Sequence, residues 1–215
     1  MSFLTMLETM SSGMLKTCAI FFLTLLFSLP LGFLVSFGRM SKNPILRNIV
    51  KVYISIMRGT PLMLQLLVWY FGPFYLFKIP IRGYRFTAII LGFAFNYAAY
   101  FGEIFRAGIE SMPQGQYEAA KVLGYTKTQT FFRIILPQVI KRILPAVTNE
   151  VITLVKDTSL AFSLAYQEVF SIAKQISTSQ TSFMPFLIAG VFYYIMNYAV
   201  AFAMERIEKS MSYYR

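Results

Sequence analysis

One stretch of this sequence places polar and charged residues at helical spacing inside an otherwise apolar run. Asn149, Thr153 and Asp157 recur every four residues, and Glu150 precedes Asp157 by seven, so a helix would present them on one face. Charged groups at membrane depth are costly unless they face a wet cavity or one another. The spacing suggests a polar stripe along a transport route, with Asp157 best placed to meet a cationic group.

The same residues also fit a helix that ends at a membrane border. In that case Lys156 and Asp157 lie at the interface and Glu150 pairs with a nearby cation, and the residues alone do not separate the two interpretations. Thr158 and Ser159 follow directly. Because Asp, Thr and Ser compete for backbone hydrogen bonds, we expect the helix to break there or a new helix to be capped. Thr158 and Ser159 are further candidates for the substrate path.

A second group of candidates, Arg58, Gly59, Thr60 and Pro61, opens another uncharged run. A basic residue before a Gly-Pro break is compatible with a gate or with a contact to a neighbouring helix. An arginine that snorkels at a membrane border, followed by a Thr-Pro helix start, is an ordinary structural alternative. From the residues alone, the structural alternative is preferred.

These residues require a helical membrane scaffold, and the composition supports one. The chain has 215 residues, of which 57% are hydrophobic and 13% charged, with a formal net charge of +11; soluble domains carry about 25% charged residues. We expect a single all-α integral membrane domain over residues 1–215, with about five transmembrane helices. The expected spans are approximately 14–38, 54–77, 86–110, 143–169 (broken) and 183–205.

Several kinds of chemistry are poorly supported. The sequence contains no histidine and one cysteine, Cys18, which argues against a metal centre and excludes an intrachain disulfide. It has no G-x-x-x-x-G-K-[ST] loop for nucleotide phosphates, and no Ser–His or paired-carboxylate hydrolase centre. We therefore expect no catalytic residues, no metal and no cofactor in this chain. The basic residues are distributed among loops, which fits membrane anchoring better than nucleic-acid binding.

The polar segment 114–145 predicts two short helices broken at Gly124, where a left-handed residue would end the first. Thr126 and Gln129 have the spacing of a capping box, so a second helix is expected there. Pro137 and Pro145 are expected to bend or stop the chain after this second helix. The positive-inside rule places this segment in the cytoplasm, but models with four or five spans both satisfy it.

Three roles fit this segment. It could lie at the lipid interface as an amphipathic hairpin, or bind nucleic acid as a helix-turn-helix, for which its basic residues are too few. It could also dock a cytoplasmic protein. Ala119 and Ala120 are small enough to let a partner come close, and Glu118 is available for a charge-assisted hydrogen bond.

The segment resembles the EAA motif of bacterial ABC importer permeases, EAA-x3-G-x9-I-x-L-P. The matching residues here are Glu118-Ala119-Ala120, Gly124, Ile134 and Leu136-Pro137. Residues 58–62, RGTPL, and 156–160, KDTSL, are similar to segments of the permeases for polar amino acids. On these motifs the chain is identified as a type I permease subunit of the histidine, arginine, glutamine and cystine branch.

The resemblance implies five spans in a bacterial cytoplasmic membrane, with the N-terminus outside and the C-terminus in the cytoplasm. It implies a dimer, with itself or with a similar permease, that imports polar amino acids by alternating access. Two separate ATPase subunits would bind ATP and Mg, and an extracytoplasmic binding protein would deliver the amino acid. A coupling elbow at 114–137 would contact the ATPase through Glu118, Ala119, Ala120, Gly124 and Tyr125.

Two other classes of function remain as alternatives. An ATP-independent channel-like protein would conduct without ATP, and a membrane anchor for a cytoplasmic complex would tolerate loss of the intramembrane acids. The sequence does not identify the amino acid. Glu150 and Asp157 favour a cationic or zwitterionic substrate over an anionic one.

Overall fold

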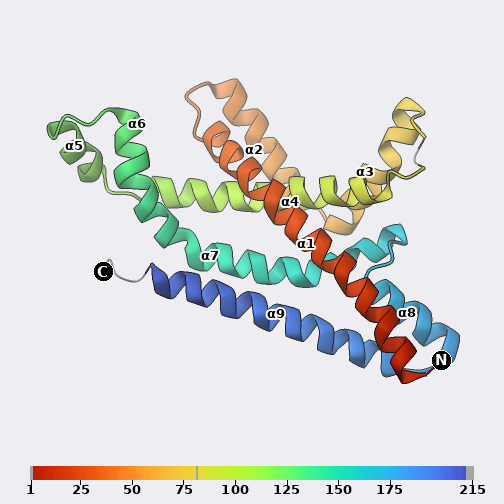
Figure 1. Ribbon diagram of the computed structural model, residues 1–215. Coiled ribbons are helices and arrows are strands. Elements are labelled where there is room, and N and C mark those ends of the chain that lie inside the picture. Colours follow the sequence, from red (N-terminus) through yellow and green to blue (C-terminus); the bar gives the residue numbers. More distant parts are fainter. Residues whose placement is uncertain (1, 81, 212–215) are drawn as a thin grey trace.

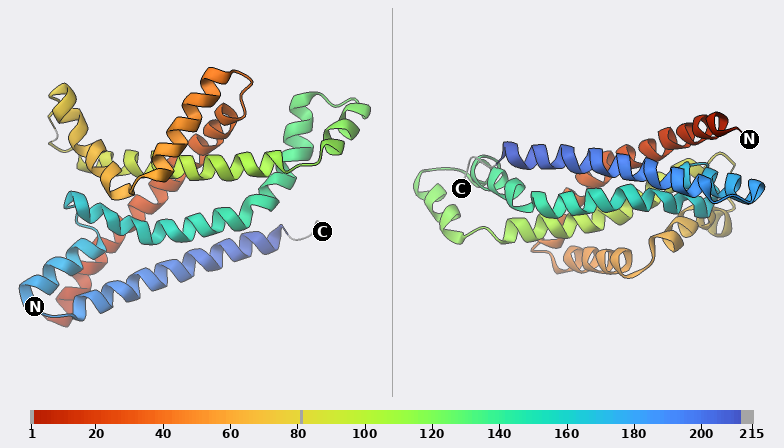
Figure 2. Two further views of the ribbon diagram at one scale, coloured as in Figure 1. Left: turned by 180° about the vertical axis from the view of Figure 1, so that it is seen from behind. Right: turned by 90° about the horizontal axis from the view of Figure 1, so that it is seen from below.

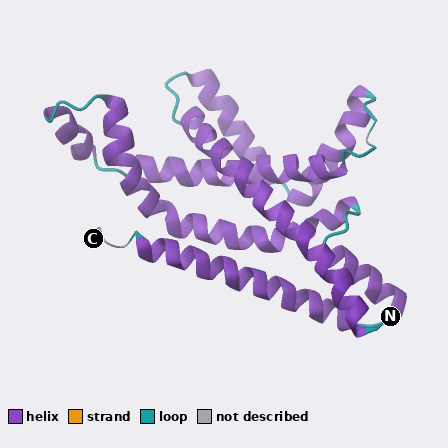
Figure 3. Cartoon of the chain, in the orientation of Figure 1, coloured by secondary structure: helices purple, strands orange, loops and turns teal. Residues whose placement is uncertain are grey.

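In the computed structural model, which describes residues 2–80 and 82–211, the chain consists of helices joined by short turns (Figure 3). The all-α expectation is confirmed. In chain order the elements are α1 (Phe3–Arg39), α2 (Pro44–Gly59), α3 (Leu62–Phe77), α4 (Arg85–Glu110), α5 (Gln114–Val122), α6 (Lys127–Gln129), the π-helix η1 (Thr130–Ile135), α7 (Leu136–Asp157), the 3-10 helix η2 (Thr158–Leu164), α8 (Val169–Gln180) and α9 (Met184–Ser210).

Among the described residues, α1, α4 and α9 are each long and apolar enough to cross a membrane. Helices α2 and α3 meet that criterion only as a pair bent by 112°. The span expected at 54–77 stays a prediction; in the structure the region is two helices, and α2 begins already at Pro44. The break has a local cause, because Pro61 has no N–H to continue the hydrogen bonds of α2. The total of five spans and the sides on which the termini lie stay predictions.

Helices α4, α7 and α9 lie side by side, and α1 crosses them and packs most extensively on α4 (Figures 1 and 2). Two glycines allow this close approach. A Cβ atom on Gly32 of α1 would lie 2.8 Å from the Cβ of Phe101, and one on Gly102 of α4 would lie 2.5 Å from Cγ1 of Val35. Small residues at such crossings let membrane helices pack backbone to backbone.

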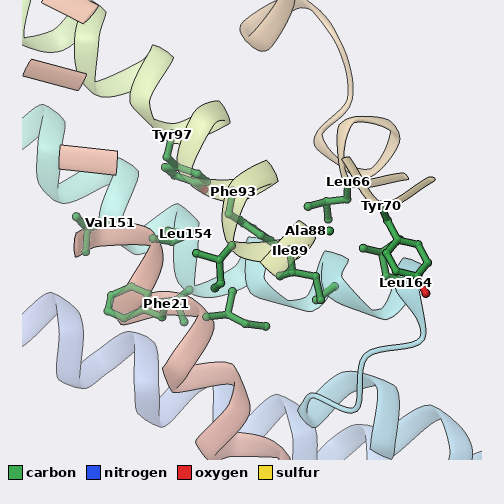
Figure 4. Close-up of a cluster of buried hydrophobic side chains, with 14 of the residues drawn as sticks. Phe21, Leu66, Tyr70, Ala88, Ile89, Phe93, Tyr97, Val151, Leu154 and Leu164 are labelled. Atoms are coloured by element: carbon green, nitrogen blue, oxygen red, sulfur yellow. The ribbon is translucent and has the colours of Figure 1, made fainter. Parts of the chain in front are cut away.

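A core of buried apolar side chains joins these helices to α3. Figure 4 shows Phe21 of α1, Leu66 of α3, Phe93 of α4 and Leu154 of α7 in this cluster. All four are at most 2% exposed. The core therefore fixes α4 and α7 relative to each other, with α3 packed against the same cluster.

The elbow, residues 114–137, projects from one end of the bundle (Figure 1). Helix α5 ends as predicted at Gly124, which has φ +78°. The Tyr125 N–H bonds to the Ala120 carbonyl and the Gly124 N–H to the Lys121 carbonyl, both at 3.0 Å, which is the Schellman pattern. The predicted capping box is confirmed, since Thr126 and Gln129 cap each other at the start of α6.

Pro137 and Pro145 were expected to bend or stop the chain; they do not stop it, so the second helix is not short, but the chain does change direction between α6 and α7 (Figure 1). The helix that starts at Lys127 continues through η1 and α7 to Asp157. The π-helical turns of η1 come just before Pro137, whose missing N–H leaves a carbonyl of the preceding turn without its helical partner. Pro145 lies inside α7, where packing against α4 and α9 retains the helix.

Candidate functional site

A cavity of about 270 Å³ opens between three parts of the chain that are far apart in sequence. Its walls come from the break between α2 and α3, the middle of α4 and the second half of α7. The lining residues are Thr60, Pro61, Leu62, Asn96, Tyr97, Tyr100, Glu150, Thr153 and Asp157. Drug-sized ligands usually occupy pockets of roughly 300–1,000 Å³, so this cavity suits a small polar solute.

Asp157 stands at the end of α7 and is held by α4. The Tyr97 hydroxyl donates a hydrogen bond to Oδ2 of Asp157 at 2.7 Å. Tyr97 itself is only 2% exposed, so its ring is fixed by the core and its hydroxyl is a rigid donor. No hydrogen bond to Oδ1 of Asp157 is present in the part of the chain that the structure describes, which leaves that oxygen available to a ligand.

Glu150 lies two helical turns before Asp157 and lines the same cavity. The guanidinium of Arg58 lies 5.2 Å from the centroid of the Tyr100 ring, and Tyr100 lines the same cavity. A cation–π contact of this kind contributes roughly 0.5–1 kcal/mol at an exposed site. The site thus offers two carboxylates and, at its border, one guanidinium. These are complementary charges for a zwitterion.

The wall at the α2–α3 break is fixed by two amide side chains. Because Pro61 has no N–H, the Met57 carbonyl lacks its helical partner. Nδ2 of Asn96 donates to that carbonyl at 2.9 Å, and Nε2 of Gln65 donates to it at 3.0 Å. The two amides also bond to each other at 3.0 Å, and Gln65 reaches the Thr60 hydroxyl at 2.8 Å. The broken span is therefore pinned to α4 at the cavity.

The structure brings several of the candidates chosen from the sequence into one place. Glu150, Thr153 and Asp157 line the cavity from α7, as the predicted stripe requires, and Thr60 and Pro61 line it from the opposite wall. Arg58 stands beside it on the Tyr100 ring. Gly59, in contrast, adjoins open space and ends α2 without an unusual φ angle.

Three of the candidates for the substrate path lie outside the cavity. Asn149 is exposed, and its carbonyl accepts the Thr153 hydroxyl at 2.9 Å. Thr158 has no exposed surface, and its hydroxyl donates to the Val155 carbonyl at 2.7 Å. The Ser159 hydroxyl donates to the backbone of the preceding turn. For Thr158 and Ser159 the physical reason is the change of helix type after Asp157, because the tighter turn of η2 directs Thr158 into the core.

Sequence reasoning missed the contribution of α4, namely Asn96, Tyr97 and Tyr100. These residues belong to the uncharged run of the span expected at 86–110. A signal was present, since an asparagine within a membrane span is costly without a partner. The i, i+1 and i+4 spacing also places Asn96, Tyr97 and Tyr100 on one side of a helix.

A second candidate surface is the tip of the elbow. Glu118 and Ala119 are exposed, whereas Ala120 is buried at 1% exposure, so the expectation that Ala120 offers room to a partner is wrong. Helix α5, which carries Ala120, packs against η1. Close to Ala120, the side chains of Val122 and Leu123 are 87% and 73% exposed. They form an apolar tip that sequence reasoning did not single out.

Comparisons with known proteins agree with this architecture. Residues 28–213 match the family described as binding-protein-dependent transport system inner membrane component. The chain is 36% identical over 200 residues to the putative glutamine transport system permease protein GlnP of Rickettsia typhi, covering 93% of this chain and 91% of that protein. It is 34% identical to the L-cystine transport system permease protein TcyB of Bacillus subtilis, covering 95% and 87%.

Solved structures give the same result. A crystal structure of an amino acid ABC transporter with histidines matches with a TM-score of 0.85 and 31% identity, covering 98% of this chain and 99% of that one. An inward-facing MetNI methionine ABC transporter matches with a TM-score of 0.78 at 21% identity, covering 99% and 100%, which is a likeness of fold. The chain therefore belongs to the family of inner membrane components of binding-protein-dependent transport systems.

Proposed function

We propose that this chain is the permease subunit of an ATP-binding-cassette importer that carries polar amino acids across a bacterial cytoplasmic membrane by alternating access. The observation that carries the proposal is the cavity in which Glu150 and Asp157 share a wall, with Arg58 at its border. The relatives named for glutamine and cystine transport, and the structure that holds histidines, support amino acids as the substrate class.

In this proposal the amino acid lies between the charges of the site. Its ammonium group meets Asp157 and Glu150, and its carboxylate points toward Arg58. An unpaired charge at the centre of a membrane helix costs about 2.5–3.5 kcal/mol on insertion scales, so a bound ammonium group would offset part of the cost of the two acids. The arrangement favours zwitterionic and cationic amino acids over anionic ones.

The elbow is the proposed docking site for the ATPase. Glu118, Ala119 and the apolar tip of Val122 and Leu123 are all exposed, and Tyr125 comes directly after the Gly124 turn. Two ATPase subunits, which bind ATP and Mg, would dock from the cytoplasm, and an extracytoplasmic binding protein would deliver the amino acid. The permease would pair with itself or with a similar chain, with its N-terminus outside and its C-terminus in the cytoplasm.

A continuous helix joins the elbow to the cavity. It runs from Lys127 through η1 and α7 to Asp157 without a loop. The 22 residues of α7 span about 33 Å at 1.5 Å per residue. A displacement of the elbow would therefore reach Asp157 through one lever, rather than through a flexible connection.

The test is uptake into proteoliposomes that contain the chain with its ATPase and binding protein. We expect ATP-dependent accumulation of at least one of radiolabelled L-glutamine, L-cystine and L-histidine. Asp157→Asn should lower that uptake at least tenfold. The matched control is Glu8→Gln, at an exposed acid of α1, which should leave uptake unchanged. Uptake without ATP would indicate a channel instead, and normal uptake by Asp157→Asn would exclude the cavity as the substrate site.

A further inference from the structure

Gln65 lies in the first turn of α3 and is not among the residues that line the cavity, but it bonds to two residues that are. Its Oε1 accepts a hydrogen bond from Nδ2 of Asn96 at 3.0 Å. Its Nε2 donates to the Thr60 hydroxyl at 2.8 Å. Asn96 belongs to α4 and Thr60 to the break between α2 and α3, so this one side chain connects two walls of the cavity.

The same amide closes the backbone at the end of α2. Nε2 of Gln65 also donates to the carbonyl of Met57 at 3.0 Å and to that of Thr60 at 3.1 Å, so its two N–H groups are shared among three acceptors. The helical partner of the Met57 carbonyl would be the N–H that Pro61 lacks. The Leu64 N–H, which the Thr60 carbonyl would use, bonds to the Pro61 carbonyl at 3.0 Å. Because backbone groups at membrane depth need partners within the protein, Gln65 fixes the backbone of the break.

Other contacts pack α2 and α3 against α4 without this amide. The ring of Trp69 on α3 stacks on the ring of Phe95 on α4, with the ring centroids 5.0 Å apart. On α2, the Tyr53 hydroxyl donates to the Phe95 carbonyl at 2.5 Å. The general placement of both helices therefore does not depend on Gln65, which leaves its amide with a local role at the break.

We infer that Gln65 is a positioning residue that holds the α2–α3 break at a fixed distance from α4 and so determines which amino-acid side chain fits the cavity. The inference rests on the proposed function, because it treats the cavity as the amino-acid site. Pro61 and Leu62 form the apolar part of the wall at the break. One methylene group more or less in an apolar pocket changes discrimination between substrates by about tenfold or more. A small shift of this wall would therefore change the preference among amino acids.

Packing alone does not account for an amide at this position. Gln65 is 8% exposed, and a buried amide is costly unless it is hydrogen-bonded. An apolar side chain of similar size would fill the same space without that cost. The amide instead specifies one arrangement of the break and α4, as fully bonded polar groups do in a core.

The first experiment measures backbone hydrogen exchange at residues 57–64 in the purified permease–ATPase complex. Gln65→Leu removes the amide, and we expect exchange in this segment to rise about tenfold, because buried carbonyls lose their donor. Thr60→Val removes only the hydroxyl that accepts from Gln65 and should raise exchange by a smaller factor. The matched control is Gln175→Leu, the same change at an exposed position of α8, which should leave exchange at 57–64 unchanged. Unchanged exchange in both Gln65→Leu and Thr60→Val would overturn the inference.

The second experiment measures saturation binding of radiolabelled L-glutamine, L-cystine and L-histidine to the same complex without its binding protein. We expect Gln65→Leu to raise the dissociation constant of the preferred amino acid about tenfold, to change the other two less, and to leave the number of binding sites per complex unchanged. General loss of structure would instead reduce the number of sites at an unchanged dissociation constant, and that result would overturn the inference. An equal rise for all three amino acids would also overturn it, because the wall would then not select among side chains.

Failure of the proposed function gives a different result. Normal binding by Asp157→Asn would show that the cavity is not the substrate site, whatever the effect of Gln65→Leu. If Asp157→Asn abolishes binding but Gln65→Leu keeps all three dissociation constants, the proposed function stands and the role of Gln65 in selectivity is refuted.

Discussion

Gly108, near the end of α4, offers the sharpest test of how α4 and α7 are held together. A Cβ atom at this position would lie 2.2 Å from Cγ2 of Ile143 and 3.1 Å from Cγ1 of Val139. Both neighbours belong to α7. The first distance is more than 1 Å shorter than the 3.4 Å at which ordinary contact begins. Because Cγ2 is attached directly to the branched Cβ of Ile143, rotation of a flexible chain end cannot relieve the clash, and Gly108→Ala must separate the helices.

Overpacking of this kind costs about 1–3 kcal/mol. For a chain of this size, that corresponds to a decrease of roughly 2–12 °C in the thermal midpoint. The assay is thermal unfolding of the purified complex, followed by ATP-dependent uptake. We expect uptake to fall with stability, because α7 is the connection between the elbow and Asp157.

A second substitution tests the stated cause. Ile143→Ala removes the methyl group that Gly108→Ala would strike, whereas Ile143→Val keeps a methyl group at that position. The pair Gly108→Ala/Ile143→Ala should therefore be more stable than the sum of the single effects predicts, and the pair with Ile143→Val should not. Equal rescue by both, or a thermal midpoint unchanged by Gly108→Ala alone, would refute this explanation of the packing.

Three further predictions concern the elbow and the break between α2 and α3. Glu118→Lys should abolish uptake while ATP hydrolysis continues, and coupled transport at the normal rate would exclude Glu118 from the contact with the ATPase. Gly124→Ala forces a side chain into a turn with φ +78°, at a cost of about 1–2 kcal/mol, and should reduce co-purification of the ATPase in a pull-down. Gly59→Ala adds a methyl group in open space, so uptake should be unchanged, and the free energy of unfolding should rise by up to about 1 kcal/mol from helix propensity. Lower uptake would contradict the placement of Gly59 away from neighbouring side chains.

Local sequence signals predicted local structure well. The turn at Gly124 and the capping box of Thr126 and Gln129 depend only on residues within one or two turns of each other, and both are present in the structure. The helical spacing of Glu150, Thr153 and Asp157 also predicted that they share one face of a helix, and in the structure all three line one cavity.

Tertiary partners were not predictable in the same way. Periodicity shows which side chains share a face but not which helix lies opposite, so Tyr97, 60 positions before its partner Asp157, was missed. Pro145 shows that tertiary packing can also override a local signal. A proline inside a helix usually bends or ends it, but α7 continues through Pro145 while it packs against α4 and α9. Thr158 was grouped with Asp157 by its place in the sequence, but the change to a 3-10 turn separates the two side chains.

The most direct test of the central claim is amino-acid binding by the purified permease–ATPase complex in the absence of any binding protein. We predict saturable binding of one of L-glutamine, L-cystine or L-histidine, lost in Glu150→Gln/Asp157→Asn and retained in the exposed-acid control Glu8→Gln. Saturable binding that survives removal of both acids would contradict the claim that this cavity holds the substrate.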